Sequence, residues 1–571
     1  MPEAVHKHLV RGQPWNFACG AALLALGLVL SAGCIDSAAP DGDSTSRKSD
    51  ELIPEDDATL AAVPAAKGME LSSGNRIPAA SATPTGDAAT QGWFGPVFSW
   101  PVVPIHVALM PDGRVLGYGT DAQGARPTTL NYVVWDPNKG MAETAFISLP
   151  NSTGSNIFCA SQLLLPDSGK VVIVGGARAD DSGRPLFGSS NTNLFDPASN
   201  QLSREPGSEM AFRRWYPTLL TTAEGQQLVL GGRDDKDQSA KDEQPATDGS
   251  YAEIPELMVP GQGWRQLTGA ASAAAYGDKR SFSYPRAWQA PNGKVLVLNN
   301  NGRFFYLNTR DQGSITDVTP PRAAAPAGQR ALPSAMYAPG KILALRNGGN
   351  AITVDLNGAT PAWQPTSAPS GLRVHSSATV LADGKVWVNG GGEDSDSLDL
   401  AAYASETWNP ATGQWTLGAA AARARLYHSV ALLLPDATVL TGGGGTPGPQ
   451  TNLNGEIYYP PYLFKQDGSG EKAPRPRITQ APQQQLGWNE AFDIRVGSGN
   501  RISRVTLLRS GSDTHSFNNE QRFLDLPFQQ KGLVIQLTTP AQRTIAPPGY
   551  YLLFVFDTLG VPSVAKLLRL S

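Results

Sequence analysis

The sequence predicts an all-β protein in which seven β-sheet repeats form a propeller and a β-sandwich follows. The chain of 571 residues contains 60 glycines and 46 prolines, which is typical of a protein with many tight turns. Charged residues make up 17% of the chain, below the usual quarter, so a large interior is expected. One hairpin-like pattern recurs seven times along the chain.

Residues 1–34 are predicted to be an export signal. Lys7 and Arg11 precede an apolar run over 17–33, whose length and small-residue end fit a secretory signal better than a spanning helix. The Ala-Gly-Cys ending at Cys34 is similar to a bacterial lipoprotein site, in which acylated Cys34 would anchor the protein to a membrane. Ordinary signal-peptidase cleavage is the alternative. Either way we expect an exported protein: extracellular, periplasmic or lipid-anchored at the cell envelope.

Residues 35–88 are predicted to be a flexible tether. They are rich in Ala, Ser, Asp, Gly, Pro and Thr and contain few aromatic residues. The net charge of the whole chain is −4, with no basic patch of the kind that nucleic-acid binders carry. We therefore expect no nucleic-acid partner.

The seven repeats share a short apolar run, a turn rich in Pro, Asp and Gly, a second apolar run, and a final Gly or Asn. They cover residues 106–119, 159–176, 216–232, 287–300, 336–349, 375–392 and 427–445. Each predicts a β-hairpin, and the spacing leaves room for two outer strands per repeat. Four-stranded units repeated radially make a propeller, so seven blades are predicted within residues 89–470. An array of β-sandwiches would not explain why hairpin after hairpin ends in Gly-Gly.

The pattern changes after residue 470. Residues 471–571 contain well-separated alternating runs at 492–496, 502–508, 534–537 and 550–557. This is the size and rhythm of an immunoglobulin-like β-sandwich.

Three repeats begin with residues that could build a reactive site. Beyond the export signal Cys159 is the single cysteine, so no disulfide is expected within the mature chain. It begins the second repeat, Tyr216 the third, and Tyr427-His428 the seventh. Inner propeller strands start at one mouth of the central channel, where these residues can meet. His515 must enter that channel on a loop of the C-terminal domain.

Tyr427 and His428 are neighbours, and an ideal strand would point them to opposite faces. We therefore expect a bend at the strand entrance that re-aims one of them. Two imidazoles with phenolate oxygens favour Cu(II), whereas zinc prefers a closed tetrahedral site that usually lacks tyrosine. Taken singly, each of these residues is more often a packing residue. The hypothesis rests on the five occurring together.

The segments around these residues resemble the copper radical oxidases, the family of galactose oxidase and glyoxal oxidase. They are Arg-Leu-Tyr427-His428-Ser, the run Thr-His515-Ser-Phe-Asn-Asn-Glu-Gln-Arg, and Tyr-Pro-Pro-Tyr-Leu-Phe464. The resemblance covers nearly everything after the tether and implies a kelch-like propeller with an early-set C-terminal domain. It also implies one copper ion bound by Tyr216, Tyr427, His428 and His515.

The same resemblance implies that Cys159 is bonded through sulfur to the ring of Tyr216, forming a thioether radical cofactor. Tyr427 would act as the general base. The expected reaction is two-electron oxidation of small aldehydes, as hydrates, or of primary alcohols, with O2 reduced to H2O2. His106 and His375 begin comparable repeats without a matching family role and are interpreted as structural; Trp215 is interpreted as a packing residue near the site.

Within this family, the residues around Tyr216 and Asp234 resemble the glyoxal oxidase branch more than galactose oxidase. Galactose oxidase carries a tryptophan two positions after the Gly-Gly of its third repeat, and here that position is Asp234. The Arg-Trp-Tyr216-Pro run resembles glyoxal oxidase, and another ring would have to cover the radical. Two alternatives stay open: a galactose or carbohydrate alcohol oxidase, and a non-catalytic kelch-type surface protein that binds glycans or proteins.

Overall fold

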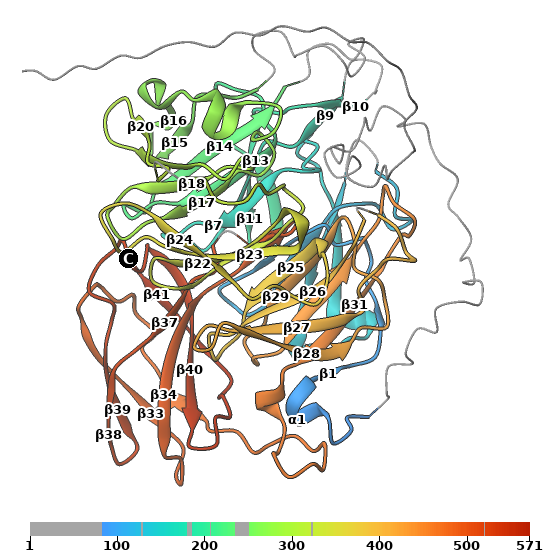
Figure 1. Ribbon diagram of the computed structural model, residues 1–571, viewed down its shortest axis with the longest axis vertical. Helices are drawn as coiled ribbons and strands as arrows, with labels where there is room; N and C mark the ends of the chain where they lie inside the picture. The colour runs from blue at the N-terminus through green and yellow to red at the C-terminus, as the bar shows by residue number, and fades with distance from the viewer. Residues whose placement is uncertain are drawn as a thin grey trace, which may run out of the picture. The chain divides into compact units, whose positions relative to one another are not determined.

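The seven predicted hairpins form the inner halves of seven β-sheet blades of a propeller (Figure 1). The computed structural model describes residues 83–571 apart from 127–129, 180–184, 206, 235–250, 321–323, 395 and 519. The predicted export signal and residues 35–82 of the predicted tether lie outside the described residues. All described residues belong to one compact unit, Pro54–Ser571. No helix among them is long and apolar enough to cross a membrane.

Each of blades one to six has four antiparallel strands of its own, with the first in sequence innermost. The strands of blades one to three are β3 (His106–Leu109), β4 (Val115–Tyr118), β5 (Asn131–Trp135), β6 (Phe146–Pro150), β7 (Ser161–Leu164), β8 (Val171–Val174), β11 (Thr192–Asp196), β12 (Gln201–Arg204), β13 (Trp215–Thr221), β14 (Gln227–Arg233), β15 (Glu256–Val259) and β16 (Gly263–Gln266). Those of blades four to six are β17 (Arg286–Gln289), β18 (Val295–Leu298), β19 (Phe304–Asn308), β20 (Ser314–Asp317), β21 (Ser334–Ala338), β22 (Lys341–Arg346), β23 (Asn350–Asp355), β24 (Ala362–Thr366), β25 (Val374–Val380), β26 (Val386–Gly392), β27 (Ala404–Asn409) and β28 (Gln414–Ala420).

Blade seven is completed by the N-terminal part of the described chain. Its own strands are β29 (Ser429–Leu433), β30 (Val439–Gly443) and β31 (Asn454–Tyr459), and the short strands β1 (Trp93–Phe94) and β2 (Phe98–Ser99) pair with β31. In Figure 1 the blue N-terminal segment accordingly lies beside orange strands. The innermost strand β29 also contacts β3 of blade one, so the ring closes.

The remaining short elements precede the first strand or lie in connections between strands. They are the hairpin β9 (Ala177–Ala179) and β10 (Pro185–Phe187), the helix α1 (Ala88–Gln91), 3₁₀ turns at Pro137–Lys139, Glu143–Ala145, Thr268–Ala270, Asn347–Gly349 and Pro461–Leu463, and a π turn at Ala273–Gly277.

The C-terminal residues form two four-stranded sheets of a sandwich, which confirms the predicted fold class. One sheet contains β32 (Ile478–Gln480), β33 (Ala491–Val496), β39 (Val534–Thr538) and β38 (Phe528–Lys531); the other contains β37 (Phe523–Asp525), β34 (Ile502–Arg509), β40 (Gly549–Asp557) and β41 (Lys566–Leu570). Alternation along β34 sends Leu507 into the sandwich core and Leu508 into the large core of blades one, five, six and seven. Because β31 ends at Tyr459 and β32 begins at Ile478, we propose the domain boundary near residue 470.

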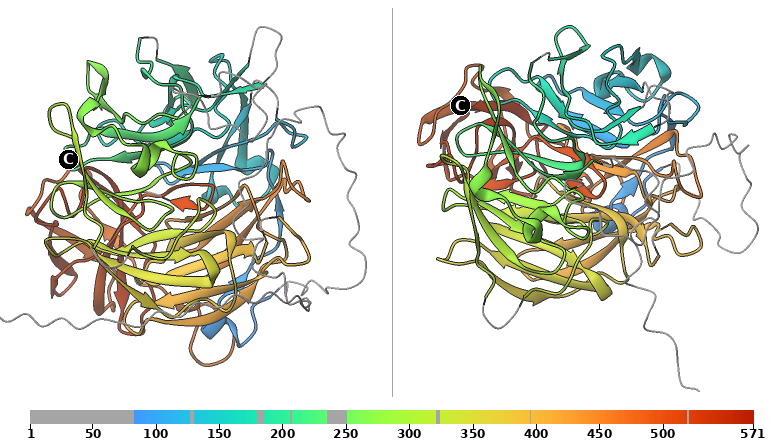
Figure 2. Two further views of the ribbon diagram at one scale, coloured as in Figure 1. Left: turned by 45° about the horizontal axis from the view of Figure 1, so that its top comes forward. Right: turned by 90° about the horizontal axis from the view of Figure 1, so that it is seen from above.

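A hairpin between the sandwich strands reaches into the propeller. Its strands β35 (Ser512–Thr514) and β36 (Phe517–Asn518) extend the sheet of blade one, with β35 paired to β3. In Figure 2 these orange-red strands lie among strands of several blades. Asp513 accepts from the Ala431 backbone of blade seven at 2.7 Å, and Ser512 donates to the Gln162 carbonyl of blade two at 2.7 Å. The tip of this hairpin is therefore fixed in the ring of inner strands.

Candidate metal centre

The bend predicted at the strand entrance beside Tyr427 is present at His428, and Cys159 and Tyr216 have the same backbone conformation. Cys159, Tyr216 and His428 have φ of 56°, 61° and 66°, in the left-handed region that side chains other than glycine rarely adopt. Such a conformation costs roughly 1–2 kcal/mol per residue and persists where the surroundings impose it.

Tyr216 shows how the bend works. Trp215 pairs with Arg233 and Pro217 with Gly231, so Tyr216 and the facing Gly232 are both left out of the ladder while the register is kept. A Cβ on the facing Gly232 would lie 2.7 Å from the Arg214 side chain, which explains why this hairpin ends in Gly-Gly.

Buried ion pairs hold these turns. Arg214, two residues before Tyr216, donates to Glu256 at 2.9 Å and to the Gly231 carbonyl at 2.6 Å. Arg425, before Tyr427 and His428, donates to Glu456 at 2.8 Å and to the Gly443 carbonyl at 2.9 Å. Each glutamate also accepts from the backbone of the loop that leads into its turn. Each pair thus ties together the inner hairpin, the third strand and the incoming loop of its blade.

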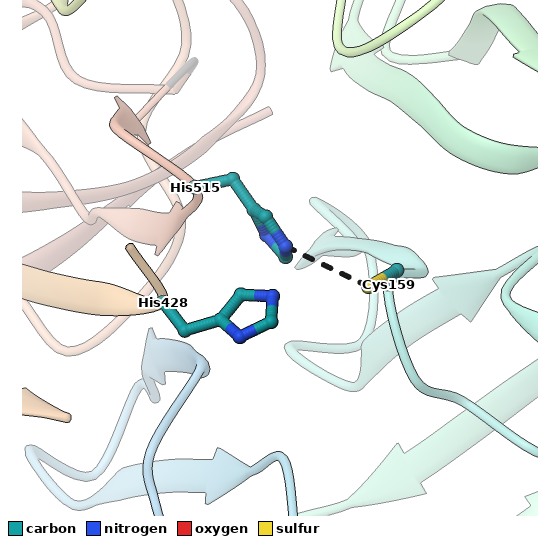
Figure 3. A group of neighbouring side chains, drawn as sticks. All are labelled: Cys159, His428 and His515. Atoms are coloured by element: carbon teal, nitrogen blue, oxygen red, sulfur yellow. Dashed lines mark hydrogen bonds between the residues drawn. The ribbon is translucent and has the colours of Figure 1, made fainter. Parts of the chain in front are cut away.

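Cys159, His428 and His515 come together in one cluster (Figure 3). One ligand atom from each lies within 4.8 Å of the others, and all three residues are buried. The Cys159 sulfur is 3.6 Å from His515 Nε2, the contact drawn dashed in Figure 3. His515 comes from the tip of the β35–β36 hairpin, so the cluster joins both predicted domains.

Hydrogen bonds fix both imidazoles with Nε2 as the acceptor nitrogen. Nδ1 of His428 faces the carbonyl oxygens of Gly445 and Thr446 at 3.0 and 2.9 Å, so it must carry the proton. The Thr514 hydroxyl donates to the Ile105 carbonyl at 3.0 Å and lies 2.6 Å from Nδ1 of His515, which therefore donates to it. The Nε2 lone pairs thus stay available, and that of His428 is buried without a hydrogen-bond partner among the described residues.

The two predicted tyrosine ligands meet at their oxygens. The Tyr216 and Tyr427 hydroxyls are hydrogen-bonded to each other, and the Tyr427 ring stacks on the adjacent His428 ring with centroids 3.8 Å apart. Edge contacts of 5.1 and 5.7 Å join the His515 ring to the rings of Tyr216 and Tyr427. All five predicted site residues therefore lie in one cluster, although the sequence elements that carry them are far apart.

Three further residues line this cluster that sequence reasoning did not assign to it. Arg330 lies 4.9 and 5.3 Å from the centroids of the Tyr216 and Tyr427 rings and donates to the Tyr427 oxygen at 3.4 Å. Tyr284 packs 5.0 Å from Tyr216 and donates to the Ala160 carbonyl beside Cys159. His375 lies 4.8 Å from the Tyr427 ring. His375 begins the sixth repeat, and this position in the sequence could have indicated that it lies at the site. Arg330 lies in an irregular loop, where no sequence pattern indicates its position.

Trp215 covers Tyr216. The two rings are stacked with centroids 3.8 Å apart and an interplanar angle of 18°. The Arg233 guanidinium lies over the Trp215 ring, 4.9 Å from its centroid. The sequence places Asp234 where galactose oxidase has its covering tryptophan, and here Trp215 supplies a ring instead. The interpretation of Trp215 as a residue near the site fits this contact.

Burial favours the neutral forms of the two phenols and the two imidazoles. It raises the pKa of Tyr216 well above its usual value, with Cys159 and Tyr427 adding to the effect, and it also raises the pKa of Tyr427 against the opposing charge of Arg330. Burial lowers the pKa of His428 and His515 well below the usual range. A metal cation would reverse this balance for the phenols, because it favours phenolate and binds neutral imidazole.

The donor set fits copper. It offers two imidazole Nε2 atoms with fixed tautomers and two phenol oxygens, a nitrogen and oxygen set that suits Cu(II). The observation that supports a bound cation is the buried Nε2 of His428, which has no hydrogen-bond partner among the described residues. A buried acceptor without a donor is costly unless it binds a cation. Cys159 could join the set as a thiolate or bond to Tyr216.

Known proteins are similar to this chain in sequence and in fold. Residues 475–570 match the family model "Galactose oxidase-like, Early set domain". A galactose oxidase of Gibberella zeae is 27% identical over 520 residues, covering 84% of this chain and 71% of that protein. An aldehyde oxidase of Arabidopsis thaliana is 26% identical over 479 residues, covering 74% and 72%.

A solved fungal alcohol oxidase in complex with copper has a TM-score of 0.73 and 26% identity, covering 84% of this chain and 100% of that one. These relatives, together with the fold and the cluster of donors, confirm the resemblance found in the sequence. Over most of its length the chain is therefore similar to the copper radical oxidases in sequence, fold and donor set.

Proposed function

We propose that this protein oxidises small aldehydes, as their hydrates, and primary alcohols at a single copper ion held by Tyr216, Tyr427, His428 and His515. The observation that carries the proposal is the convergence of these four side chains and Cys159 from four separate elements. A packing role for each would not account for two imidazoles whose Nε2 lone pairs are directed by hydrogen bonds from the other ring nitrogen.

Bound copper(II) would supply one oxidising equivalent, and the Tyr216 radical would supply the other. In the proposed reaction the Tyr427 oxygen accepts the proton of one substrate hydroxyl, and the Tyr216 oxygen accepts a hydrogen atom from the substrate carbon. An aldehyde hydrate and O2 then yield a carboxylic acid and H2O2, and a primary alcohol and O2 yield an aldehyde and H2O2. In both cases two hydrogens leave the substrate and end in peroxide.

We further propose that Cys159 and Tyr216 become joined by a thioether bond. The Tyr216 amide donates to the Cys159 carbonyl at 3.1 Å, so the two turns are adjacent, and the thiol is buried. Sulfur on the ring donates electron density and eases one-electron oxidation of the phenol. The bond replaces one S–H and one ring C–H, and O2 takes up the two hydrogens as peroxide. If Cys159 instead binds copper as a thiolate, the thiol will be recovered when copper is removed.

The choice between aldehyde and sugar substrates rests on two sets of findings. Trp215 and the glyoxal oxidase-like run around Tyr216 favour small aldehydes, and the aldehyde oxidase of Arabidopsis thaliana is similar over most of the chain. The galactose oxidases of Gibberella zeae match over a larger share, up to 93% of this chain, so galactose or another carbohydrate alcohol is the second candidate. A non-catalytic kelch-type binding role would leave the cluster of copper ligands without a purpose.

One experiment tests these proposals together. The purified chain is loaded with copper, oxidised, and assayed for H2O2 release with small aldehydes, primary alcohols and galactose. We expect one copper per chain, a visible radical absorption band, and highest kcat/KM with an aldehyde. Peptide mapping after reduction should find Cys159 and Tyr216 in one species that is two hydrogens lighter than the two peptides together. Copper binding without peroxide release from any substrate would refute the oxidase assignment.

We also propose that the chain is exported and keep two forms of its N-terminus open. Lipid labelling of the mature protein would identify acylated Cys34 as a membrane anchor. An unlabelled chain that starts after the predicted signal would instead indicate ordinary signal-peptidase cleavage.

A further inference from the structure

His375 is placed at the site by the same device that places the proposed ligands. Its φ is 65°, and it is left out of the ladder between β25 and β26, where Val374 pairs with Gly392 and Ser376 with Gly390. Arg373, two residues earlier, donates to Glu406 at 3.1 Å and to the Ala404 carbonyl at 2.8 Å. A strained turn held by a buried ion pair is a costly way to position a side chain that only fills space.

The hydrogen bonding of His375 sets it apart from the other three described histidines. His428, His515 and His106 each have Nδ1 held by a hydrogen bond, and His106 donates to the Gln162 amide oxygen at 2.9 Å. Neither ring nitrogen of His375 makes a hydrogen bond with another described residue. His375 also lies outside the group of close metal-ligating atoms. Its imidazole is therefore available to something other than the protein or the metal.

Exposure indicates which side of the cluster faces the solvent. Cys159 is 0% and His428 1% exposed, whereas Tyr427 and His375 are 7% and 8% exposed, and Arg330 is partly exposed. The ring of His375 lies 4.8 Å from that of Tyr427. A substrate that enters from this side and gives its proton to Tyr427 will have its neighbouring atoms beside His375.

We propose that His375 binds the second hydroxyl group of an aldehyde hydrate and so selects hydrates over primary alcohols. The inference rests on the proposed function and names the substrate group that this residue recognises. A hydrate carries two hydroxyls on one carbon. One loses its proton to Tyr427, and the other donates a hydrogen bond to a nitrogen of His375 and stays intact through the oxidation. A primary alcohol has hydrogen in that position and leaves the nitrogen without a donor.

The expected size of the effect follows from the cost of an unpaired polar group. Sites that hydrogen-bond a substrate hydroxyl reject analogues lacking it, by factors that grow with the burial of the binding group. Because His375 is largely but not fully buried, we expect it to contribute roughly tenfold to thirtyfold to the preference.

The test compares acetaldehyde and ethanol, which share a carbon skeleton, in the copper-loaded full chain. The alcohol is followed as a substrate or, where its turnover is too slow, as a competitive inhibitor through its Ki. In His375→Phe the ratio of aldehyde kcat/KM to alcohol kcat/KM, or to 1/Ki, should fall at least tenfold. His375→Gln, which keeps a hydrogen-bonding group, should recover most of the ratio. Copper content and the radical absorption band should stay as in the parent.

His106→Phe is the matched control. His106 begins the first blade, is 0% exposed, and stacks on Tyr118 at 4.4 Å, so its loss removes an imidazole near the site without removing one from the solvent side. We expect it to leave the ratio unchanged, whatever it does to both rates. Equal losses for aldehyde and alcohol in His375→Phe, or failure of His375→Gln to recover the ratio, would overturn the inference. A parent enzyme inactive on both substrates would instead overturn the proposed function.

Discussion

The buried ion pair of blade seven should control both stability and copper affinity. Arg425 and Glu456 are 1% and 0% exposed, with the guanidinium 2.8 Å from the carboxylate, which also accepts from the Ala422 backbone at 2.7 Å. Glu456→Ala leaves the arginine charge buried and uncompensated, which typically costs about 3–5 kcal/mol of folding free energy. It also releases the turn that presents Tyr427 and His428, so we expect copper affinity to fall roughly tenfold to a hundredfold.

Blade six supplies the control for that prediction. Arg373 and Glu406 are each 3% exposed and make corresponding contacts, with additional hydrogen bonds to Glu406 from the Ser370 hydroxyl and Arg373 Nε, but their turn presents His375, which is not among the proposed ligands. Glu406→Ala should lower the urea midpoint about as much as Glu456→Ala while leaving copper affinity near that of the parent. Both are measured by urea unfolding of the metal-free protein and by titration with copper against a competing chelator. Equal copper losses in the two variants, or none in Glu456→Ala, would refute the reasoning.

Three further predictions concern single side chains of the site. His428→Ala and His515→Ala should each weaken copper binding at least tenfold in the chelator titration while the fold is kept, and unchanged affinity in either would remove that residue from the ligand set. Tyr427→Phe should keep most copper but lower kcat by roughly a hundredfold or more through loss of the base, and a large loss of copper with normal kcat would reverse its role. Trp215→Leu should shorten the lifetime of the Tyr216 radical band several-fold, with Trp215→Phe in between, because the substitution removes a stacked ring whose contact contributes about 0.5–1.5 kcal/mol. Equal lifetimes in the parent and both variants would show that this ring does not protect the radical.

The blades could be predicted from the sequence because their hairpins are local. The repeat over 427–445 has its turn residues and both apolar runs within a few positions of each other, and it forms β29 and β30. The closure of blade seven by β1 and β2 could not be predicted in this way. These strands have two residues each, too few for a period, and their partner β31 lies several hundred residues away along the chain. Their pairing is decided by the closed ring and not by their own sequence.

The candidate site could be predicted only in part, again because only residues within a local repeat carry a signal in the sequence. Cys159, Tyr216, Tyr427 and His428 stand at fixed places in a repeat, so their convergence follows from the propeller itself. Arg330 stands in an irregular loop before blade five, and only the packed structure places its guanidinium beside two phenol rings. Loop residues of this kind carry function without a periodic signal in the sequence.

The two stacked pairs at the site have one physical cause. Trp215 and Tyr216 are neighbours, as are Tyr427 and His428, and a regular strand would send the members of each pair to opposite faces. In each pair the second residue has a left-handed φ, and in both the ring centroids lie 3.8 Å apart, with interplanar angles of 18° and 23°. The kind of bend that would bring Tyr427 and His428 to one metal in blade seven therefore also lays Trp215 over Tyr216 in blade three. Two adjacent ring side chains at the start of a hairpin that ends in Gly-Gly are thus a signal, readable from sequence, for a stacked pair at the mouth of the propeller.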